Sequence, residues 1–262
     1  MTFVKHFIAI AIACAAFGNH AWAADVREAR ETPVLVELFT SEGCSSCPPA
    51  DALLQKLDAS SPVPGIRLIV LSEHVDYWNG DGWKDPYSSS LFTQRQDAYC
   101  RSLNISDPYT PQIIVDGGGE LHARTPEQVV QTFQKAAAAQ KVVIRIASVK
   151  VEAATPLVVR GRIGSDGDSE KHNADLYVAL ALDHAESQVL RGENTGRHLT
   201  HVAVVESLRK VGKMEHGMSL AKDFEMKLKP GIDPANIRIV AFLQEPGAGK
   251  VLGAALQRPP IQ

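Results

Sequence analysis

The hydrophobic pattern changes near residue 140, and this change constrains the fold more than any other feature. From residue 32 to about 139, short β-rich runs alternate with runs of helical period, which is typical of an α/β sheet. From residue 141 onward the helical period almost disappears, and seven β-type runs follow one another, as in a β-sandwich. We therefore expect an α/β domain over residues 24–140 and an all-β, sandwich-like domain over residues 141–262.

Single elements can be placed within the α/β part. The pattern predicts strands at residues 34–39 and 66–71, with a helix between them on which apolar residues recur at helical spacing. A second helix is expected over residues 91–103 and a strand over residues 112–115. The last helix has a clear start, because Thr125 can serve as its N-cap and a proline follows.

The N-terminus predicts export. Two basic-type residues precede the apolar run 7–17, and Ala21-Trp22-Ala23 supplies the small residues of a signal-peptidase site, so residues 1–23 are expected to be a signal peptide. The alternatives are a membrane anchor, for which the apolar run is short, and a lipid-modified Cys14. We expect a periplasmic or secreted protein that has no membrane span after cleavage.

Composition narrows the class of protein. The chain has 262 residues, of which 45% are hydrophobic, so it can bury a full core. Its formal net charge of -3 argues against binding of nucleic acid.

Three cysteines remain once the signal peptide is removed. In an exported protein the close pair Cys44 and Cys47 can form a disulfide. A disulfide across a two-residue gap constrains the unfolded chain very little. We therefore expect this pair to have a chemical role rather than a structural one. Cys100 lies on a predicted helix, where a single cysteine is most often a small buried hydrophobe. The alternatives for Cys100 are a partner role with the Cys44 and Cys47 pair and a disulfide between chains.

The cysteine pair falls where a predicted strand ends and a helix begins, in the segment VELFTSEGCSSCPPAD. Unpaired N–H groups and the positive end of the helix dipole stabilise a thiolate there and lower its pKa. We expect Cys44 to be the reachable, attacking sulfur and Cys47 to be the less exposed sulfur that resolves the mixed disulfide. The two prolines that follow fit a first helical turn.

Glu37 is a lone acid within an apolar strand, where burying a carboxyl group costs several kcal/mol unless something offsets it. One interpretation is a carboxyl of raised pKa beneath the cysteines, which accepts the proton that Cys47 loses. The other is that Glu37 reaches solvent at a sheet edge.

The motif Cys-X-X-Cys between a strand and a helix resembles the thioredoxin superfamily, and the stretch YTPQIIVDGGGE is similar to the Thr-Pro strand of that superfamily. The resemblance implies a thioredoxin-like fold for the first domain. It also implies that Thr110 and Pro111 bind substrate, with the proline in cis beside the sulfurs. Gly43, where thioredoxins carry a tryptophan, and the dipeptide Ser45-Ser46 depart from the usual pattern.

A narrower resemblance covers nearly the whole mature chain. The stretches ELFTSEGCSSCPPAD, HVDYWNGDGWKDPYSS, YTPQIIVDG and VLRGENTGRHLTHVAVV resemble an exported bacterial thioredoxin-like family described as domain of unknown function 1223. This resemblance implies a fold and a compartment but names no substrate.

Two polar segments supply further candidate residues. The aromatic-rich loop 72–89 carries Trp78, which would border a substrate groove or fill a small core under the loop. His74 in the same loop, together with the two cysteines, would form a soft site for Cu(I) or Zn(II). For the run 191–201, hydrogen bonding against the first domain is expected rather than a zinc site.

These observations lead to three hypotheses of function. The first is an exported thiol-disulfide oxidoreductase that needs no cofactor and acts on a protein or small-molecule thiol or disulfide, together with a redox partner protein. In it Cys44, Cys47 and Glu37 are catalytic, and Thr110, Pro111 and Trp78 bind substrate. The second is a copper- or zinc-handling protein. The third is a non-catalytic binding module with an inert disulfide, in which the β-rich part does the work.

Overall fold

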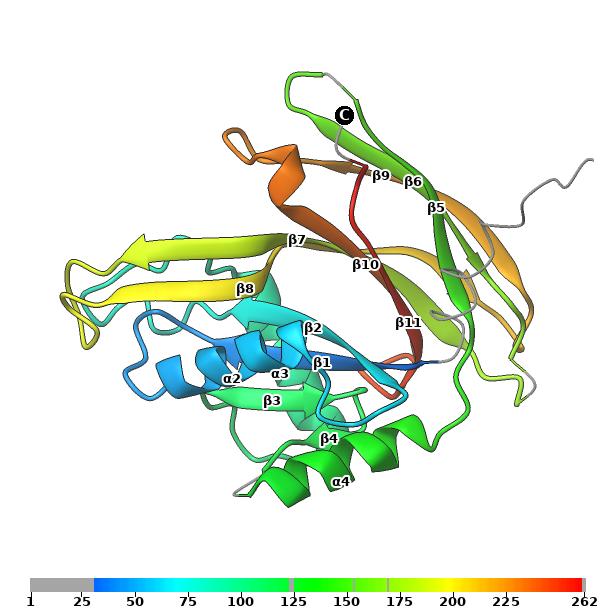
Figure 1. The fold of residues 1–262 in the computed structure, drawn as a ribbon, viewed down its shortest axis with the longest axis horizontal. Coiled ribbons are helices and arrows are strands. Elements are labelled where there is room, and N and C mark those ends of the chain that lie inside the picture. The colour runs from blue at the N-terminus through cyan, green and yellow to red at the C-terminus, as the bar shows by residue number, and fades with distance from the viewer. Residues whose placement is uncertain (1–30, 123–124, 153, 169, 261–262) are drawn as a thin grey trace, which may run out of the picture. The chain divides into compact units, whose positions relative to one another are not determined.

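A mixed sheet of eight strands, drawn from both parts of the chain, dominates the computed structural model (Figure 1). The strand order is β11-β10-β7-β8-β2-β1-β3-β4, and a second sheet has the order β5-β6-β9. The structure describes residues 31–122, 125–152, 154–168 and 170–260, so the predicted signal peptide lies outside the described residues. The strands are β1 (Thr32–Thr40), β2 (Ile66–His74), β3 (Gln112–Val115), β4 (Gly119–Glu120), β5 (Ile144–Glu152), β6 (Val158–Ser165), β7 (Ala174–Gln188), β8 (His198–Met214), β9 (Leu220–Lys227), β10 (Ile237–Gln244) and β11 (Val251–Gln257).

The local elements of the first part form where the sequence predicts them. In the described residues the α-helices are α2 (Pro48–Ala59), α3 (Ser90–Leu103) and α4 (Pro126–Ala137), and a 3-10 turn, η1 (Pro234–Asn236), precedes β10. β1 and β2 pair in parallel and α2 connects them. The Thr125 hydroxyl caps α4 by accepting the N–H of Gln128. None of the helices in the described part of the chain has the length and apolar character needed to span a bilayer.

The two faces of β1 pack against different helices. Side chains alternate along a strand, so the even-numbered residues, such as Leu38, share a core with α2 and α4. The odd-numbered residues, such as Leu35 and Phe39, pack with Phe92 and Tyr99 of α3. The parity of a residue in β1 therefore decides which helix it meets.

The prediction of an α/β thioredoxin-like domain followed by a separate all-β, sandwich-like domain is wrong. All seven predicted β-type runs are strands, but four of them (β7, β8, β10 and β11) extend the sheet of the first part. β8 pairs in parallel with β2, where Ser72 lies opposite Val204. A shared core then mixes Leu35 and Ile69 with Val240 and other residues of the second part.

The physical reason for this difference is the free edge of β2. An unpaired strand edge exposes a row of N–H and C=O groups that must be covered. β8 supplies the missing partner, and it brings its hairpin partner β7 and then β10 and β11 into the same sheet. Residues from Thr32 onward consequently form one compact unit.

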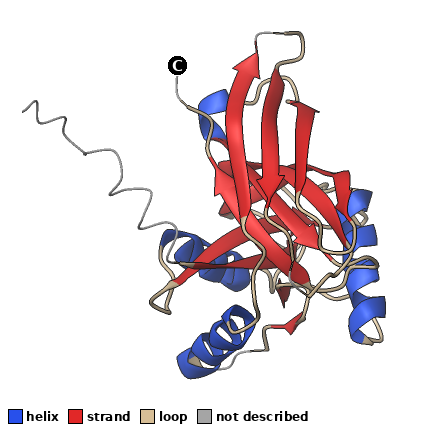
Figure 2. Cartoon of the chain, turned by 90° about the vertical axis from the view of Figure 1, so that its right-hand side faces the viewer, coloured by secondary structure: helices blue, strands red, loops and turns tan. Residues whose placement is uncertain are grey.

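The second sheet, β5-β6-β9, packs on the part of the large sheet built from β7 and β10 (Figure 2). Val159, Ile163 and Phe224 from the smaller sheet share a core with Leu180 and Ile239 from the larger one. Sandwich-like packing therefore occurs, but one of its layers is the same sheet that carries β1 and β2.

Candidate functional site

Cys44 and Cys47 form a disulfide in the turn between β1 and α2, with Cα atoms 5.5 Å apart. Cys47 is the N-cap residue of α2, and its carbonyl accepts the N–H groups of Ala50 and Asp51. The cysteine pair therefore stands at the entry to the helix, as the sequence predicts.

Both sulfur-bearing residues are buried in this oxidised structure. Cys44 is 0% exposed and Cys47 is 1% exposed, whereas Ser45 and Ser46 between them are exposed. The expectation that Cys44 is reachable from solvent is wrong for this state. The reason lies in segments far along the chain that pack over the turn.

The tip of the β7–β8 hairpin, residues 189–197, covers the disulfide turn (Figure 1). The Asn194 amide Nδ2 donates to the carbonyls of Glu42 at 2.8 Å and of Cys44 at 3.0 Å. Glu193 Oε2 accepts the N–H of Ser45 at 3.1 Å. Asn194 is itself completely buried. The prediction that this polar run is held by hydrogen bonds against the first part of the chain is confirmed.

Trp78 lies between the cysteine turn and the Thr-Pro segment. Its indole Nε1 donates to Thr110 Oγ1 at 2.8 Å. A Cβ atom added to Gly43 would lie only 3.0 Å from the Trp78 Cβ, so Trp78 fills the space beside the residue that precedes Cys44. The Thr110–Pro111 peptide bond is cis. The structure thus brings the predicted substrate-binding residues Trp78, Thr110 and Pro111 into one neighbourhood.

Glu37 is placed elsewhere. It is fully buried, but Oε1 accepts from Arg95 Nε at 2.7 Å, and the Tyr99 hydroxyl donates to Oε2. Being odd-numbered in β1, Glu37 faces α3 and not α2, so neither interpretation drawn from the sequence describes its surroundings. The ion pair with Arg95, which lies 58 residues later in the sequence, offsets the cost of burying the Glu37 carboxyl group.

Glu73 of β2 completes this ion-pair cluster. Its Oε1 lies 3.4 Å from Arg95 Nε. Burial, followed by the negative charge of Glu37, raises the pKa of Glu73 well above its ordinary value. Glu73 therefore holds its proton more tightly than an ordinary glutamate does, while Arg95 lies closest to Glu37.

A second cluster of buried titratable groups lies on the α2 face, and the sequence analysis did not single it out as a unit. His201 Nε2 lies 3.4 Å from Glu42 Oε1, and His201 Nδ1 lies 3.5 Å from Asp51 Oδ1. The acids precede Cys44 by two residues and follow Cys47 by four, and that spacing is the signal that could have identified them. Nothing in the sequence indicated that His201 joins them.

His74 belongs to the same cluster. Its Nδ1 lies 2.7 Å from Asp85 Oδ2, and its ring meets the His201 ring edge-on with centroids 4.8 Å apart. Burial would raise the pKa of Asp85, but His74 and the hydrogen bonds from Glu42 and Tyr87 lower it below the ordinary value. Within the described ranges no group of three or more histidine, cysteine, aspartate or glutamate residues is arranged to hold a metal ion.

His201 carries the main charge of this cluster. Burial alone would lower the pKa of its imidazole, but the nearby carboxyl groups of Asp51 and Glu42 outweigh burial and raise the pKa to about 9. His201 is therefore protonated at neutral pH and is neutralised by two carboxylates beside the disulfide turn.

Cys100, in α3, is buried and forms no disulfide in the part of the chain that the structure describes. Burial raises the pKa of its thiol. The interpretation of Cys100 as a small buried hydrophobe is confirmed.

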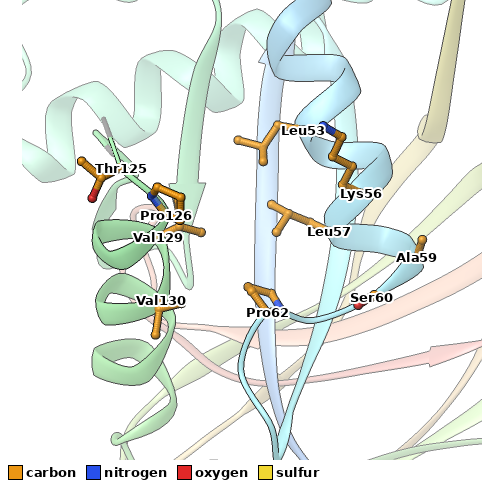
Figure 3. A pocket seen from close by; sticks show the side chains of 10 residues that line it. All are labelled: Leu53, Lys56, Leu57, Ala59, Ser60, Pro62, Thr125, Pro126, Val129 and Val130. Carbon is orange, nitrogen blue, oxygen red and sulfur yellow. The ribbon is translucent and has the colours of Figure 1, made fainter.

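An apolar groove lies between α2 and α4, separate from the cysteine turn (Figure 3). Among the described residues that line it, none is a cysteine, a histidine or a carboxylate. The residues that line it are Leu53, Lys56, Leu57, Ala59, Ser60, Pro62, Thr125, Pro126, Val129 and Val130.

The chain belongs to the family described as protein of unknown function DUF1223, whose profile matches residues 35–244. This match spans the disulfide turn, the hairpin tip and both buried titratable clusters. No curated protein matches the chain.

Among solved structures, protein AGR_C_4864 from Agrobacterium tumefaciens is similar in fold, with a TM-score of 0.64 and 24% identity. The similarity covers 87% of this chain and 96% of that chain. The sporulation control protein Spo0M from Bacillus subtilis is much less similar, with a TM-score of 0.30 and 14% identity over 46% of this chain and 48% of that chain.

Proposed function

We propose that the protein is a thiol-disulfide oxidoreductase that works through the Cys44–Cys47 pair. The observation that carries the proposal is a disulfide that links the turn before α2 to the N-cap of that helix. A bridge between residues three apart contributes little to stability, because it closes a very short loop. At the N-terminal end of a helix, however, a thiolate is stabilised, so a larger fraction of the thiol is ionised and the sulfur is a better leaving group.

The reaction is an exchange of two electrons. In the reduced protein, one cysteine sulfur attacks a client disulfide and forms a mixed disulfide, and the second cysteine displaces the client sulfur. The client leaves as two thiols while Cys44 and Cys47 become the disulfide, and a dithiol donor restores the reduced pair. Trp78 and Thr110, which lie beside the turn, are the residues that we expect the client to meet first.

Access to the sulfurs requires the hairpin tip to move in the oxidised protein. Asn194 and Glu193 hold the turn through side-chain hydrogen bonds to its backbone, and three such bonds are few enough to break at modest cost. We therefore propose a couple that is sheltered when oxidised and that reacts when the tip opens. An exported location, in the periplasm or outside the cell, is part of the proposal, because a stable disulfide requires an oxidising compartment.

The test is reduction of insulin by dithiothreitol in the presence of the purified mature protein. We expect the wild type to accelerate the reduction and Cys44→Ser to abolish the acceleration. Cys100→Ala is the matched control, because it removes the remaining cysteine of the mature chain and leaves the pair intact. A wild type with no activity, or a Cys44→Ser variant as active as the wild type, would refute the proposed function.

A further inference from the structure

A buried acid occupies the first turn of the same helix as Cys47. Asp51 follows Cys47 by four residues, and its backbone N–H donates to the Cys47 carbonyl at 3.1 Å. Cys47 already has helical backbone angles, so the two side chains share one side of the turn. Asp51 is 6% exposed, and its Oδ1 accepts no hydrogen bond from the described residues, so this oxygen is open to a donor.

β8, a strand from the second part of the chain, places His201 beside Asp51. Gln55, one turn further along α2, donates to the carbonyl and to the hydroxyl of Thr200 at 2.6 and 3.1 Å. These bonds set the register of α2 against β8 and place His201 Nδ1 at 3.5 Å from Asp51. The other titratable groups that face His201 are Glu42 from the turn, His74 from β2 and Tyr87 from the following loop.

We propose that Asp51 is the proton acceptor of the Cys44–Cys47 couple and that His201 is the positioning residue that keeps Asp51 available. The inference rests on the proposed function. As the disulfide closes, the Cys47 thiol gives its proton to the Asp51 carboxylate while its sulfur displaces the client sulfur from Cys44. The client thiolate takes a proton from water, and Asp51 later releases its own proton to solvent. Reduction of the disulfide runs the same transfer in reverse.

The charge of His201 explains why an acid can act as a base in a buried place. Burial disfavours an ionised carboxylate, and a neighbouring second carboxylate, Glu42, disfavours it further. Protonated His201 stands between the two and offsets both effects at neutral pH. Without this imidazole, the two buried acids would face each other with no positive charge between them.

The experiment follows the mixed disulfide that precedes closure. Reduced full-length mature protein is mixed with hydroxyethyl disulfide between pH 6 and pH 10, free thiols are alkylated after an acid quench, and the species are counted by mass spectrometry. We expect Asp51→Asn to accumulate the Cys44 mixed disulfide and to close at least tenfold more slowly than the wild type at pH 7. The deficit should vanish near pH 10, where the Cys47 thiol ionises without a base.

Three further variants test how specific the effect is. His201→Gln should accumulate the mixed disulfide in the same way at pH 7, and Asp51→Glu should restore part of the closing rate. His198→Gln, an exposed histidine on the same strand, should behave like the wild type. Closure by Asp51→Asn at the wild-type rate, or slowed equally at every pH as a general structural defect would slow it, would overturn the inference and leave the proposed function standing. A wild type that never forms a disulfide with the probe would refute the proposed function itself.

Discussion

At the scale of single residues, two buried acids, Glu37 of β1 and Asp51 of α2, lie in different surroundings. One interpretation of the sequence makes Glu37 a proton acceptor, because it stands alone in an apolar strand before the cysteines. Strand alternation turns it toward Arg95 on α3, whereas Asp51 shares the α2 face with the cysteine turn. The position of Glu37 in β1 therefore makes it part of an ion pair on the α3 side, and the candidate proton acceptor is an acid of α2.

This assignment predicts opposite outcomes for two similar substitutions. Glu37→Gln removes the partner of a buried arginine, so it should lower the free energy of unfolding by about 3–5 kcal/mol. Glu73→Gln mimics the neutral form that the fold already favours. The free energy of unfolding should therefore be unchanged or higher at pH 7, because the raised pKa of Glu73 makes its contribution to stability fade as pH rises above the ordinary value for glutamate.

Urea unfolding at pH 5 and pH 7 measures both effects. The gain from Glu73→Gln should be larger at pH 7 than at pH 5. If Glu73→Gln destabilised the protein as much as Glu37→Gln, Glu73 would instead be the ionised partner of Arg95.

At the scale of elements, the hairpin tip at residues 189–197 decides whether the disulfide can be reached. The helix entry alone would leave the turn open, as the sequence analysis expected. The tip adds a side-chain clamp whose central residue, Asn194, is buried and bonded to two carbonyls of the turn. In the proposed function, opening of this one loop is what exposes the disulfide to a client.

Loss of this clamp should speed reduction. Asn194→Ala removes two hydrogen bonds, each worth about 0.5–1.5 kcal/mol, and a change of about 1.4 kcal/mol is tenfold in an equilibrium. We expect dithiothreitol to reduce the disulfide about tenfold faster in Asn194→Ala than in the wild type, as measured by alkylation of the released thiols.

The matched control is Thr195→Ala, which removes a hydroxyl that bonds only to Gly192 within the tip. Its reduction rate should equal that of the wild type. Equal rates for Asn194→Ala and the wild type would mean that another segment limits access to the sulfurs.

At the scale of the whole molecule, the pairing of β2 with β8 turns two sequence regions of different character into one sheet. The ion pair of Arg238 with Asp58 and Asp183 adds a second link between α2 and the later strands. A core shared across residue 140 cannot be completed by either region alone.

This architecture predicts that a fragment of residues 24–140 does not fold. It would expose the edge of β2 and the apolar residues that meet β10, such as Leu35 and Ile69. Its circular dichroism and amide NMR spectra should be those of an unfolded or aggregated chain, whereas the mature protein should unfold in one transition by all probes. A well-dispersed NMR spectrum of the fragment would show that the first region is autonomous.

The local secondary structure could be predicted from the sequence. The strands and helices, the N-cap at Thr125 and the place of the cysteine pair at a helix entry all depend on periodicity and capping within a few neighbouring residues. The family resemblance was also carried by short contiguous stretches, and it is confirmed over residues 35–244.

Other features depended on contacts between segments that are distant in the sequence. No local sequence pattern specifies which strand edge a later strand will pair with, or which face of the sheet a distant segment will cover. The joining of β8 to β2, the hydrogen bonds of Asn194 to the cysteine turn and the meeting of His201 with Asp51 were decided only in the tertiary structure. The physical reason is that unpaired strand edges and buried charges must be satisfied somewhere, and the partner is chosen by the packing of the whole chain.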